Sequence, residues 1–339
     1  MNIVKIKHIA TCILFFIFFE ALAQPTVGIV NRNYFDSNRS NWLGNGPRPL
    51  RSIIWYPAEV NGQKESITEV QQFLSPVIVY RNASVNNRQQ KYPLIVVSHG
   101  SQGNASKMQW LGYYLASNGY IVIAVSHNGT DEEERRINGL TLSDFCMWER
   151  PKDISVVLNK ILKDHDFSKK IDTNKIAVAG FSLGGATAIW VAGAIFNMDR
   201  LAKSDPNIPE RYREDVNRFT AFVETNPIGI NSAKHREDSF KDKRIKAVFA
   251  LSPAIGQGFD RQGLQGITVP VQIVVGDADM VNPMDLNAKH YTQNIPTTLP
   301  LIVLPGERGH YLKPSTGREP YELQEVGQLA ESFFKRVLK

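Results

Sequence analysis

The sequence predicts an α/β fold in which a mainly parallel, twisted sheet carries helices on both faces. Short, continuously apolar runs alternate along the chain with segments of helical periodicity, and no repeat or low-complexity tract interrupts them. Strands that are apolar at every position are covered on both faces, as is typical of parallel sheets. A charged segment at 195–243 separates two of the predicted strands and is interpreted as an inserted cap.

Seven apolar runs are the predicted strands: residues 51–56, 94–98, 120–125, 176–179, 245–251, 271–275 and 301–304. Four helices are predicted between and after them. The first has apolar positions from 108 to 115 and ends at 118–119, the second is opened by Pro151 and runs to Leu162, and the others cover 184–194 and 321–338. Alternation of this kind indicates a mainly parallel sheet with helices on both faces, and α/β folds of this length often form a single domain.

The segment 195–243 breaks the alternation because it is charged and is interrupted by Pro206, Pro209 and Pro227. A helical pattern persists within it at 211–222. Ligands bind at the carboxyl edge of such sheets, where this segment is inserted, so we interpret it as a cap over the site. The alternative is an ordinary surface excursion.

The N-terminal residues 1–23 resemble a secretory signal peptide. Two lysines precede an apolar run at 9–19, which is too short for an ordinary membrane span, and a small-x-small cleavage site ends at Ala23. We therefore expect cleavage after Ala23 and a secreted or periplasmic domain over 24–339. An uncleaved anchor is the alternative, because Glu20 is unusual so close to the apolar run.

The composition of the chain argues against a nucleic-acid partner, a membrane span and an internal disulfide. The chain has 39 Lys and Arg against 33 Asp and Glu, a mild excess spread along its length, so we expect no nucleic-acid partner. No second apolar run predicts a stable membrane span. After loss of the leader only Cys146 is left, so the fold must be held by its apolar core and not by an internal disulfide.

The stretch 175–188 (KIAVAGFSLGGATA) contains the pattern Gly-x-Ser-x-Gly centred on Ser182. The serine follows a buried run and precedes a helical pattern, which is the context of a nucleophile elbow. Small residues at Gly180, Gly184 and Gly185 would relieve crowding there, and the free N–H groups of the following helix point toward the serine oxygen. We interpret Ser182 as a nucleophile; the alternative is a glycine-rich turn that serves packing alone.

A nucleophilic serine needs a base, and His310 is the favoured candidate. It lies in the loop LPGERGH after the last predicted strand, at the edge where the other loops of the site would meet. His99 and His127 follow other predicted strands and are rival candidates.

The carboxylate that orients the base is predicted in the segment VGDADMVNP, which follows the strand at 271–275 and contains Asp277 and Asp279. A calcium loop is excluded because glycine is missing at its sixth position and glutamate at its twelfth. The order serine, aspartate, histidine along the chain matches one known arrangement of the Ser-His-Asp triad. From the residues alone both aspartates stay open.

An oxyanion hole needs preformed N–H donors, typically one after the nucleophile and one from an early loop. We expect the N–H groups of Leu183 and Ser101 to supply them, the latter from the loop 98–103 (SHGSQG). His99 in this loop is interpreted as a structural residue. Candidates to line a pocket are His99, Gly100, His127 and Phe181, while Trp110 and Phe259 are aromatics that fit the core better than a pocket.

These motifs together resemble the α/β-hydrolase superfamily, and more narrowly the bacterial hydrolases related to dienelactone hydrolase and to platelet-activating factor acetylhydrolase. The resemblance covers nearly the whole chain after the leader. Its motifs are Arg48-Pro49-Leu50 with Trp55-Tyr56-Pro57, His99-Gly100, Arg150-Pro151-x-Asp153, Gly180 to Gly185, Arg244 to Val248, Gly276-x-x-Asp279 and Gly309-His310. The superfamily pattern places the acid three residues after the glycine, which implies Asp279.

Two departures separate the chain from those subgroups. Dienelactone hydrolases proper use a cysteine where this chain has Ser182, and the lipid-mediator acetylhydrolases carry their acid where this chain has Leu251-Ser252-Pro253-Ala254. We therefore expect a secreted serine ester hydrolase that cleaves short- to medium-chain or lipid-like esters through an acyl-enzyme, without metal or organic cofactor. The alternatives are a peptidase or amidase with the same triad, and a non-catalytic binding protein on this scaffold.

Overall fold

The computed structural model describes residues 26–67, 76–130, 141–204, 210–313 and 322–339, together with residues 136 and 139. The predicted leader at 1–23 lies outside the described residues, as do residues 205–209 of the predicted insertion. Within the described ranges, none of the helices combines the length and the apolar character needed to cross a bilayer.

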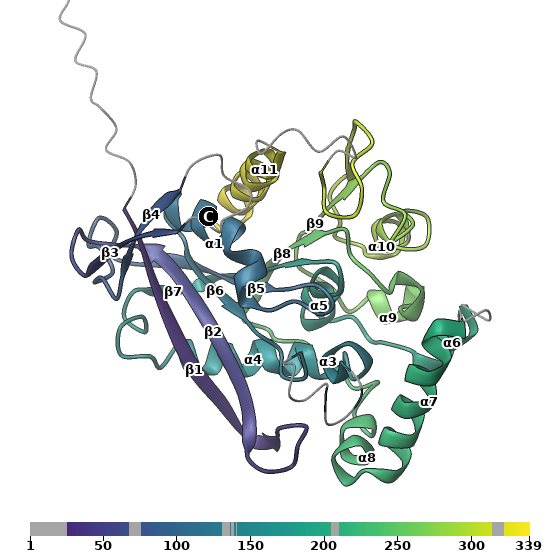
Figure 1. Cartoon of the computed structure of the whole chain (residues 1–339). Helices are drawn as coiled ribbons and strands as arrows, with labels where there is room; N and C mark the ends of the chain where they lie inside the picture. The colour runs from purple at the N-terminus through teal and green to yellow at the C-terminus, as the bar shows by residue number, and fades with distance from the viewer. Residues whose placement is uncertain are drawn as a thin grey trace, which may run out of the picture.

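A ten-stranded sheet forms the centre of the described chain (Figure 1), in the order β10-β9-β8-β7-β5-β6-β2-β1-β4-β3. The strands from β10 to β6 are mutually parallel, whereas β2 is antiparallel to both β6 and β1. The strand bounds are β1 Val27–Ser40, β2 Pro47–Pro57, β3 Gln63–Ile67, β4 Val77–Arg81, β5 Tyr92–Ser98, β6 Ile121–Val125, β7 Ile171–Phe181, β8 Ile245–Leu251, β9 Val271–Gly276 and β10 Ile302–Leu304.

The seven predicted strands correspond to β2 and β5 to β10, while β1, β3 and β4 were not predicted. β1 pairs with β2 along most of its length, and the polar outer half of this hairpin is fixed by charged contacts. Arg39 of β1 binds Asp36, Glu149 and Asp153. A strand stabilised in this way lacks the apolar run that indicates a strand in sequence.

Helices cover both faces of the sheet, as predicted. α1 (Gln109–Ser117) and α11 (Glu322–Val337) pack on one face, and α4 (Glu149–Ile161), α5 (Leu183–Val191) and α10 (Ala288–Asn294) pack on the other. The remaining helical segments are η1 Ala105–Met108, α3 Leu142–Phe145, α6 Met198–Ser204, α7 Glu210–Thr225, α8 Pro227–Ala233, η2 Gly256–Gly258 and α9 Arg261–Leu264.

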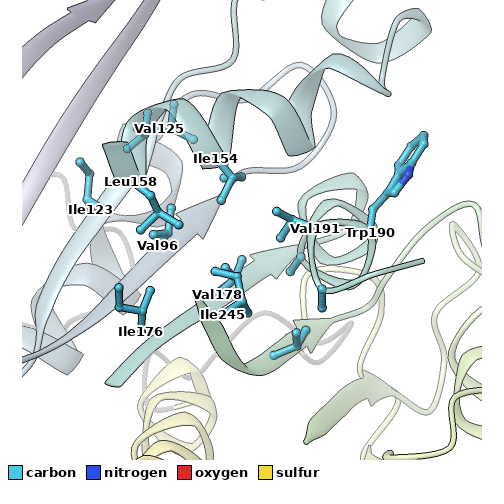
Figure 2. Close-up of a cluster of buried hydrophobic side chains, with 14 of the residues drawn as sticks. Val96, Ile123, Val125, Ile154, Leu158, Ile176, Val178, Trp190, Val191 and Ile245 are labelled. Carbon is cyan, nitrogen blue, oxygen red and sulfur yellow. The ribbon is translucent and has the colours of Figure 1, made fainter. Parts of the chain in front are cut away.

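Alternation along the central strands sends side chains to the two faces in turn. Figure 2 shows Val96 and Val178 on the face covered by α4, where they meet Ile154 and Leu158. Their neighbour Val97 belongs instead to the apolar cluster under α1 and α11. Each fully buried aliphatic side chain contributes about 1.5–3 kcal/mol, so these strands form a rigid base for the loops at their carboxyl ends.

The described part of the insertion consists of α6, α7 and α8, which flank the sheet beyond α3 and α4 (Figure 1). The Phe219 ring of α7 lies 5.3 Å from the Phe145 ring and 6.1 Å from the Trp148 ring. The Trp148 indole N–H donates to the hydroxyl of Ser232 in α8. The insertion is therefore packed on the chain next to α4, and its role as a cap stays a prediction.

Candidate active site

Ser182 lies at the sharp turn between β7 and α5, with φ 55° and ψ −120°. A left-handed conformation in a non-glycine residue costs about 1–3 kcal/mol and persists only where surrounding contacts enforce it. Here the Ser182 N–H donates to the carbonyl of Leu251 on β8 at 2.8 Å. A Cβ on Gly180 would lie 2.1 Å from the carbonyl oxygen of Gly184, so the turn requires glycine at this position.

The structure brings Ser182, His310 and Asp279 together from three separate loops. The Ser182 Oγ is 3.0 Å from His310 Nε2, and His310 Nδ1 is 2.9 Å from Asp279 Oδ2. A neutral imidazole that donates from Nδ1 to the carboxylate accepts the serine hydroxyl proton at Nε2. All three residues are at most 8% exposed, so water screens this chain of hydrogen bonds only weakly.

The Asp279 carboxylate is held by backbone as well as by His310. Its Oδ1 accepts hydrogen bonds from the N–H groups of Val281 at 3.1 Å and Asn282 at 2.9 Å. Burial raises the pKa of Asp279, but the hydrogen bonds from His310 and Asn282 outweigh it and leave the pKa below its ordinary value. The group is therefore ionised at neutral pH and favours the His310 imidazolium when that forms.

Asp277, the rival acid in the sequence, has a different role in the structure. Its carboxylate accepts hydrogen bonds from the N–H groups of Gly306, Glu307 and Arg308, and does not contact His310 among the bonds of the described chain. These three donors belong to the loop that carries His310. Asp277 therefore fastens the loop that carries His310 to the segment that carries Asp279.

The loop 98–103 packs directly against the elbow. A Cβ on Gly100 would lie 3.3 Å from the Ser182 Cβ, and one on Gly184 would lie 2.1 Å from the Ser98 carbonyl oxygen. Leu183 opens α5, so its N–H has no acceptor within the helix. The structure thus brings the Leu183 and Ser101 segments to Ser182 from two sides.

His99 and His127 were pocket candidates and rival bases, but both side chains are enclosed, at 0% and 1% exposure. His99 Nδ1 lies 2.7 Å from the Gly100 carbonyl, and its Nε2 accepts from the His127 N–H. Burial, together with the nearby Arg150 guanidinium, keeps the pKa of His99 well below its ordinary value. Both side chains are closed off from a ligand because their ring nitrogens are used to hold the loop.

His127 belongs to a buried chain of polar groups that the sequence analysis missed. Its Nε2 is 2.8 Å from the Ser98 hydroxyl and its Nδ1 is 2.9 Å from Asp153, which in turn pairs with Arg48 at 2.8 Å. Burial lowers the pKa of His127 to about 4, although Asp153 opposes this. This second serine–histidine–aspartate chain is inaccessible to a substrate and braces the end of β5.

Aromatic rings lie beside His310. The Phe181 ring lies 4.9 Å from the His310 ring and 5.6 Å from the Tyr311 ring. Tyr311 is 68% exposed and Met280, next to the acid, is 85% exposed. Trp110 and Phe259 are buried in the two core clusters, in agreement with their interpretation as core residues.

A model of the PET hydrolase-like (PETase) family matches residues 37–226, more than half of the chain. The chain belongs to the PET hydrolase-like family. The matched segment includes the loop 98–103 and Ser182, and it ends before Asp279 and His310.

Among similar proteins, "Cutinase est1" of Thermobifida alba is 24% identical over 258 residues, which cover 75% of this chain and 64% of that protein. "Probable dipeptidyl-aminopeptidase B" of Talaromyces marneffei is 23% identical over 195 residues, which cover 48% of this chain and 21% of that protein. The chain therefore spans less than two thirds of the length of either curated relative. A solved structure of a ferulic acid esterase from Streptomyces cinnamoneus superposes with a TM-score of 0.60 at 17% identity, covering 94% of this chain and 91% of that chain.

These comparisons confirm the predicted α/β-hydrolase fold and the resemblance to serine esterases of that superfamily. They also agree with the prediction that the chain is an ester-cleaving enzyme. The curated relatives named above are a cutinase and a probable dipeptidyl-aminopeptidase, whereas the motifs resemble those of dienelactone hydrolases and acetylhydrolases.

Proposed function

We propose that this protein is a carboxylic ester hydrolase that acts through a covalent acyl-enzyme on Ser182. The observation that carries the proposal is the continuous chain of hydrogen bonds from the Ser182 hydroxyl through His310 to Asp279, at the end of a strained strand–helix turn. Membership of the PET hydrolase-like family and the likeness to cutinases support the same chemistry.

In the proposed mechanism the Ser182 Oγ attacks the ester carbonyl while His310 Nε2 takes its proton. The N–H groups of Leu183 and Ser101 stabilise the negative oxygen of the tetrahedral intermediate. His310 then delivers its proton to the leaving alcohol as the carbon–oxygen bond breaks. A water molecule, deprotonated by His310, cleaves the acyl-enzyme and regenerates Ser182. Asp279 keeps the imidazole in the required tautomer throughout.

The substrate we propose is a short- to medium-chain or lipid-like ester. Two exposed apolar residues directly follow Asp279, Met280 at 85% and Val281 at 66% exposure, and would contact an apolar acyl chain or alcohol. We also propose that the leader is cleaved after Ala23 and that the protein acts outside the cytoplasm. N-terminal sequencing of the protein recovered from the medium or periplasm tests this; a chain beginning at Met1 would refute it.

The mechanism is tested with nitrophenyl esters of increasing acyl length, run on the wild-type protein and on Ser182→Ala. We expect turnover at short and medium chains, complete loss in the variant, and labelling of Ser182 alone by a fluorophosphonate probe. Undiminished turnover by Ser182→Ala would refute the mechanism. A wild-type protein that neither turns over esters nor reacts with the probe would support the binding-protein alternative.

The amidase alternative shares every residue of this mechanism, and one relative carries the name of an aminopeptidase. Matched ester and amide substrates with the same acyl group separate the two. We expect the ester to be turned over faster, and faster turnover of the amide would overturn the choice.

A further inference from the structure

The loop that carries Ser101 is held by a bridge of two charged residues on its outer side, Asp144 and Arg150. Asp144 lies in α3 and Arg150 in the first turn of α4. Neither has a part in the proton transfers of the proposed mechanism. Both contact the loop directly.

The Arg150 guanidinium is completely buried and all three of its nitrogens donate. Nη1 donates to the carbonyl of His99 at 2.8 Å, Nε to the carbonyl of Ser143 at 3.0 Å, and Nη2 to Asp144 at 3.1 Å. A buried cation requires a charged partner, and among the described residues Asp144 is the carboxylate that accepts a hydrogen bond from it. The two residues therefore form one unit.

Asp144 uses the rest of its carboxylate on the loop. Its Oδ2 accepts from the Ser101 hydroxyl at 2.6 Å, and its Oδ1 faces the Gln102 N–H at 3.4 Å. Gln102 has a left-handed φ of 54°, a conformation that needs such external support. The exposed stretch Ser101–Gln102 is thus fixed from one side by Asp144, and from the other by the packing of Gly100 on Ser182.

We propose that Asp144, held by Arg150, is a positioning residue that aims the Ser101 N–H at the oxyanion. This inference rests on the proposed function, because it assigns a role within that reaction. A donor contributes to rate only when it is fixed where charge develops, and loss of one oxyanion donor lowers kcat by about 10²–10³-fold. Removal of the support alone leaves the donor present but loosely aimed, so the effect is smaller.

The test compares Asp144→Ala with a matched control, Asp242→Ala. Asp242 has the same partners in kind, an arginine (Arg244) and a serine hydroxyl (Ser155 at 2.9 Å), and its side chain is 8% exposed. It precedes β8, about 20 Å along the strand from the edge where Ser182 lies. Loss of either carboxylate removes a bond to an arginine and a bond to a serine hydroxyl. Of the two aspartates, Asp144 is the one that contacts the loop 98–103.

We expect Asp144→Ala to lower kcat on nitrophenyl butyrate by about 10–100-fold while KM changes by less than about threefold. The affinity for a butyl trifluoromethyl ketone, whose adduct with Ser182 carries the oxyanion, should fall by the same factor as kcat/KM. Asp242→Ala should keep wild-type kcat even where it unfolds at a lower temperature. Asp144→Asn keeps an acceptor for the Ser101 hydroxyl but removes the charge that Arg150 pairs with, so it should recover part of the rate. If Asp144→Ala does not fold, Ser101→Ala supplies the result: it removes the hydroxyl that donates to Asp144, keeps the Ser101 N–H and the Arg150 pair, and should show the same loss of kcat.

The proposal is overturned if Asp144→Ala keeps kcat within twofold of wild type, or if Asp242→Ala loses as much rate, which would indicate general destabilisation. Hydrogen exchange of the amides of 98–103 is measured on the same samples. Faster exchange there in Asp144→Ala alone supports the positioning role even if the wild-type protein has no esterase activity. In that case the proposed function fails, and the support of the loop stands.

Discussion

The buried histidines His99 and His127 predict that folding stability falls steeply in weak acid. In the folded protein the pKa of His127 is lowered to about 4 from the ordinary 6.5, chiefly by burial, and the pKa of His99 is lowered well below 6.5 for the same reason. In weak acid these two histidines therefore bind protons in the unfolded chain but stay largely neutral in the folded protein. The stabilisation is fully present above about pH 6.5 and is lost as the pH falls from there toward 4.

The size of the effect follows from this difference in proton binding. At about pH 5, protonation of a histidine with the ordinary pKa lowers the free energy of the unfolded chain by about 2 kcal/mol. A histidine that stays neutral in the folded protein gives the folded state no such gain. His127 alone then costs about 2 kcal/mol between about pH 7 and pH 5, and the lowered pKa of His99 adds to the loss in the same direction. This is a large share of the 5–15 kcal/mol that stabilises a typical domain.

The assay is urea unfolding followed by tryptophan fluorescence at about pH 7 and pH 5. We expect His127→Gln to reduce the pH-dependent loss by about 2 kcal/mol, because the proton that His127 binds only in the unfolded chain no longer contributes. His165→Gln is the control, since the His165 side chain is fully exposed. A His127→Gln protein that keeps the full wild-type difference between the two pH values would refute the reasoning.

Three further substitutions test the turn at Ser182, the hydrogen bonds of Asp277 to the His310 loop, and the apolar core. Gly184→Ala places a methyl group 2.1 Å from the Ser98 carbonyl oxygen, so we expect a lower urea midpoint; a wild-type midpoint would contradict the packing described. Asp277→Ala removes the acceptor of three N–H groups in the His310 loop, so kcat/KM on nitrophenyl butyrate should fall about tenfold with little change in melting temperature. A kcat/KM equal to that of the wild type would mean that the His310 loop keeps its position without Asp277. Phe259→Ala should cost about 3–5 kcal/mol in urea unfolding without raising KM, and a raised KM at unchanged stability would place the ring in the pocket.

The sequence was most informative where one kind of force decides the structure. Parallel strands buried on both faces must be continuously apolar, so β5, β6, β8, β9 and the second half of β7 were recognisable from their apolar runs. The elbow was recognisable for a related reason, since a Cβ at Gly180 or Gly184 would overlap backbone atoms and few residues can replace them.

The sequence was least informative where buried charges pair across long distances. Arg39 and Asp153 are 114 positions apart, and either one, read alone, is a solvated surface residue. Asp144 and Ser101 are 43 positions apart, and nothing in the sequence around either one indicates their hydrogen bond. Asp277 and Asp279 lie two residues apart in the loop after β9, so the resemblance to a known family was needed to choose between them. The structure shows that each has its own contacts.

The contact between Phe219 of the insertion and Phe145 of α3 links the periphery of the molecule to its chemistry. Phe145 is the neighbour of Asp144 in the chain, so α7 packs directly against the helix that carries Asp144. If Asp144 positions the loop as proposed, substitution of Phe219 would alter turnover without changing any group that touches the ester.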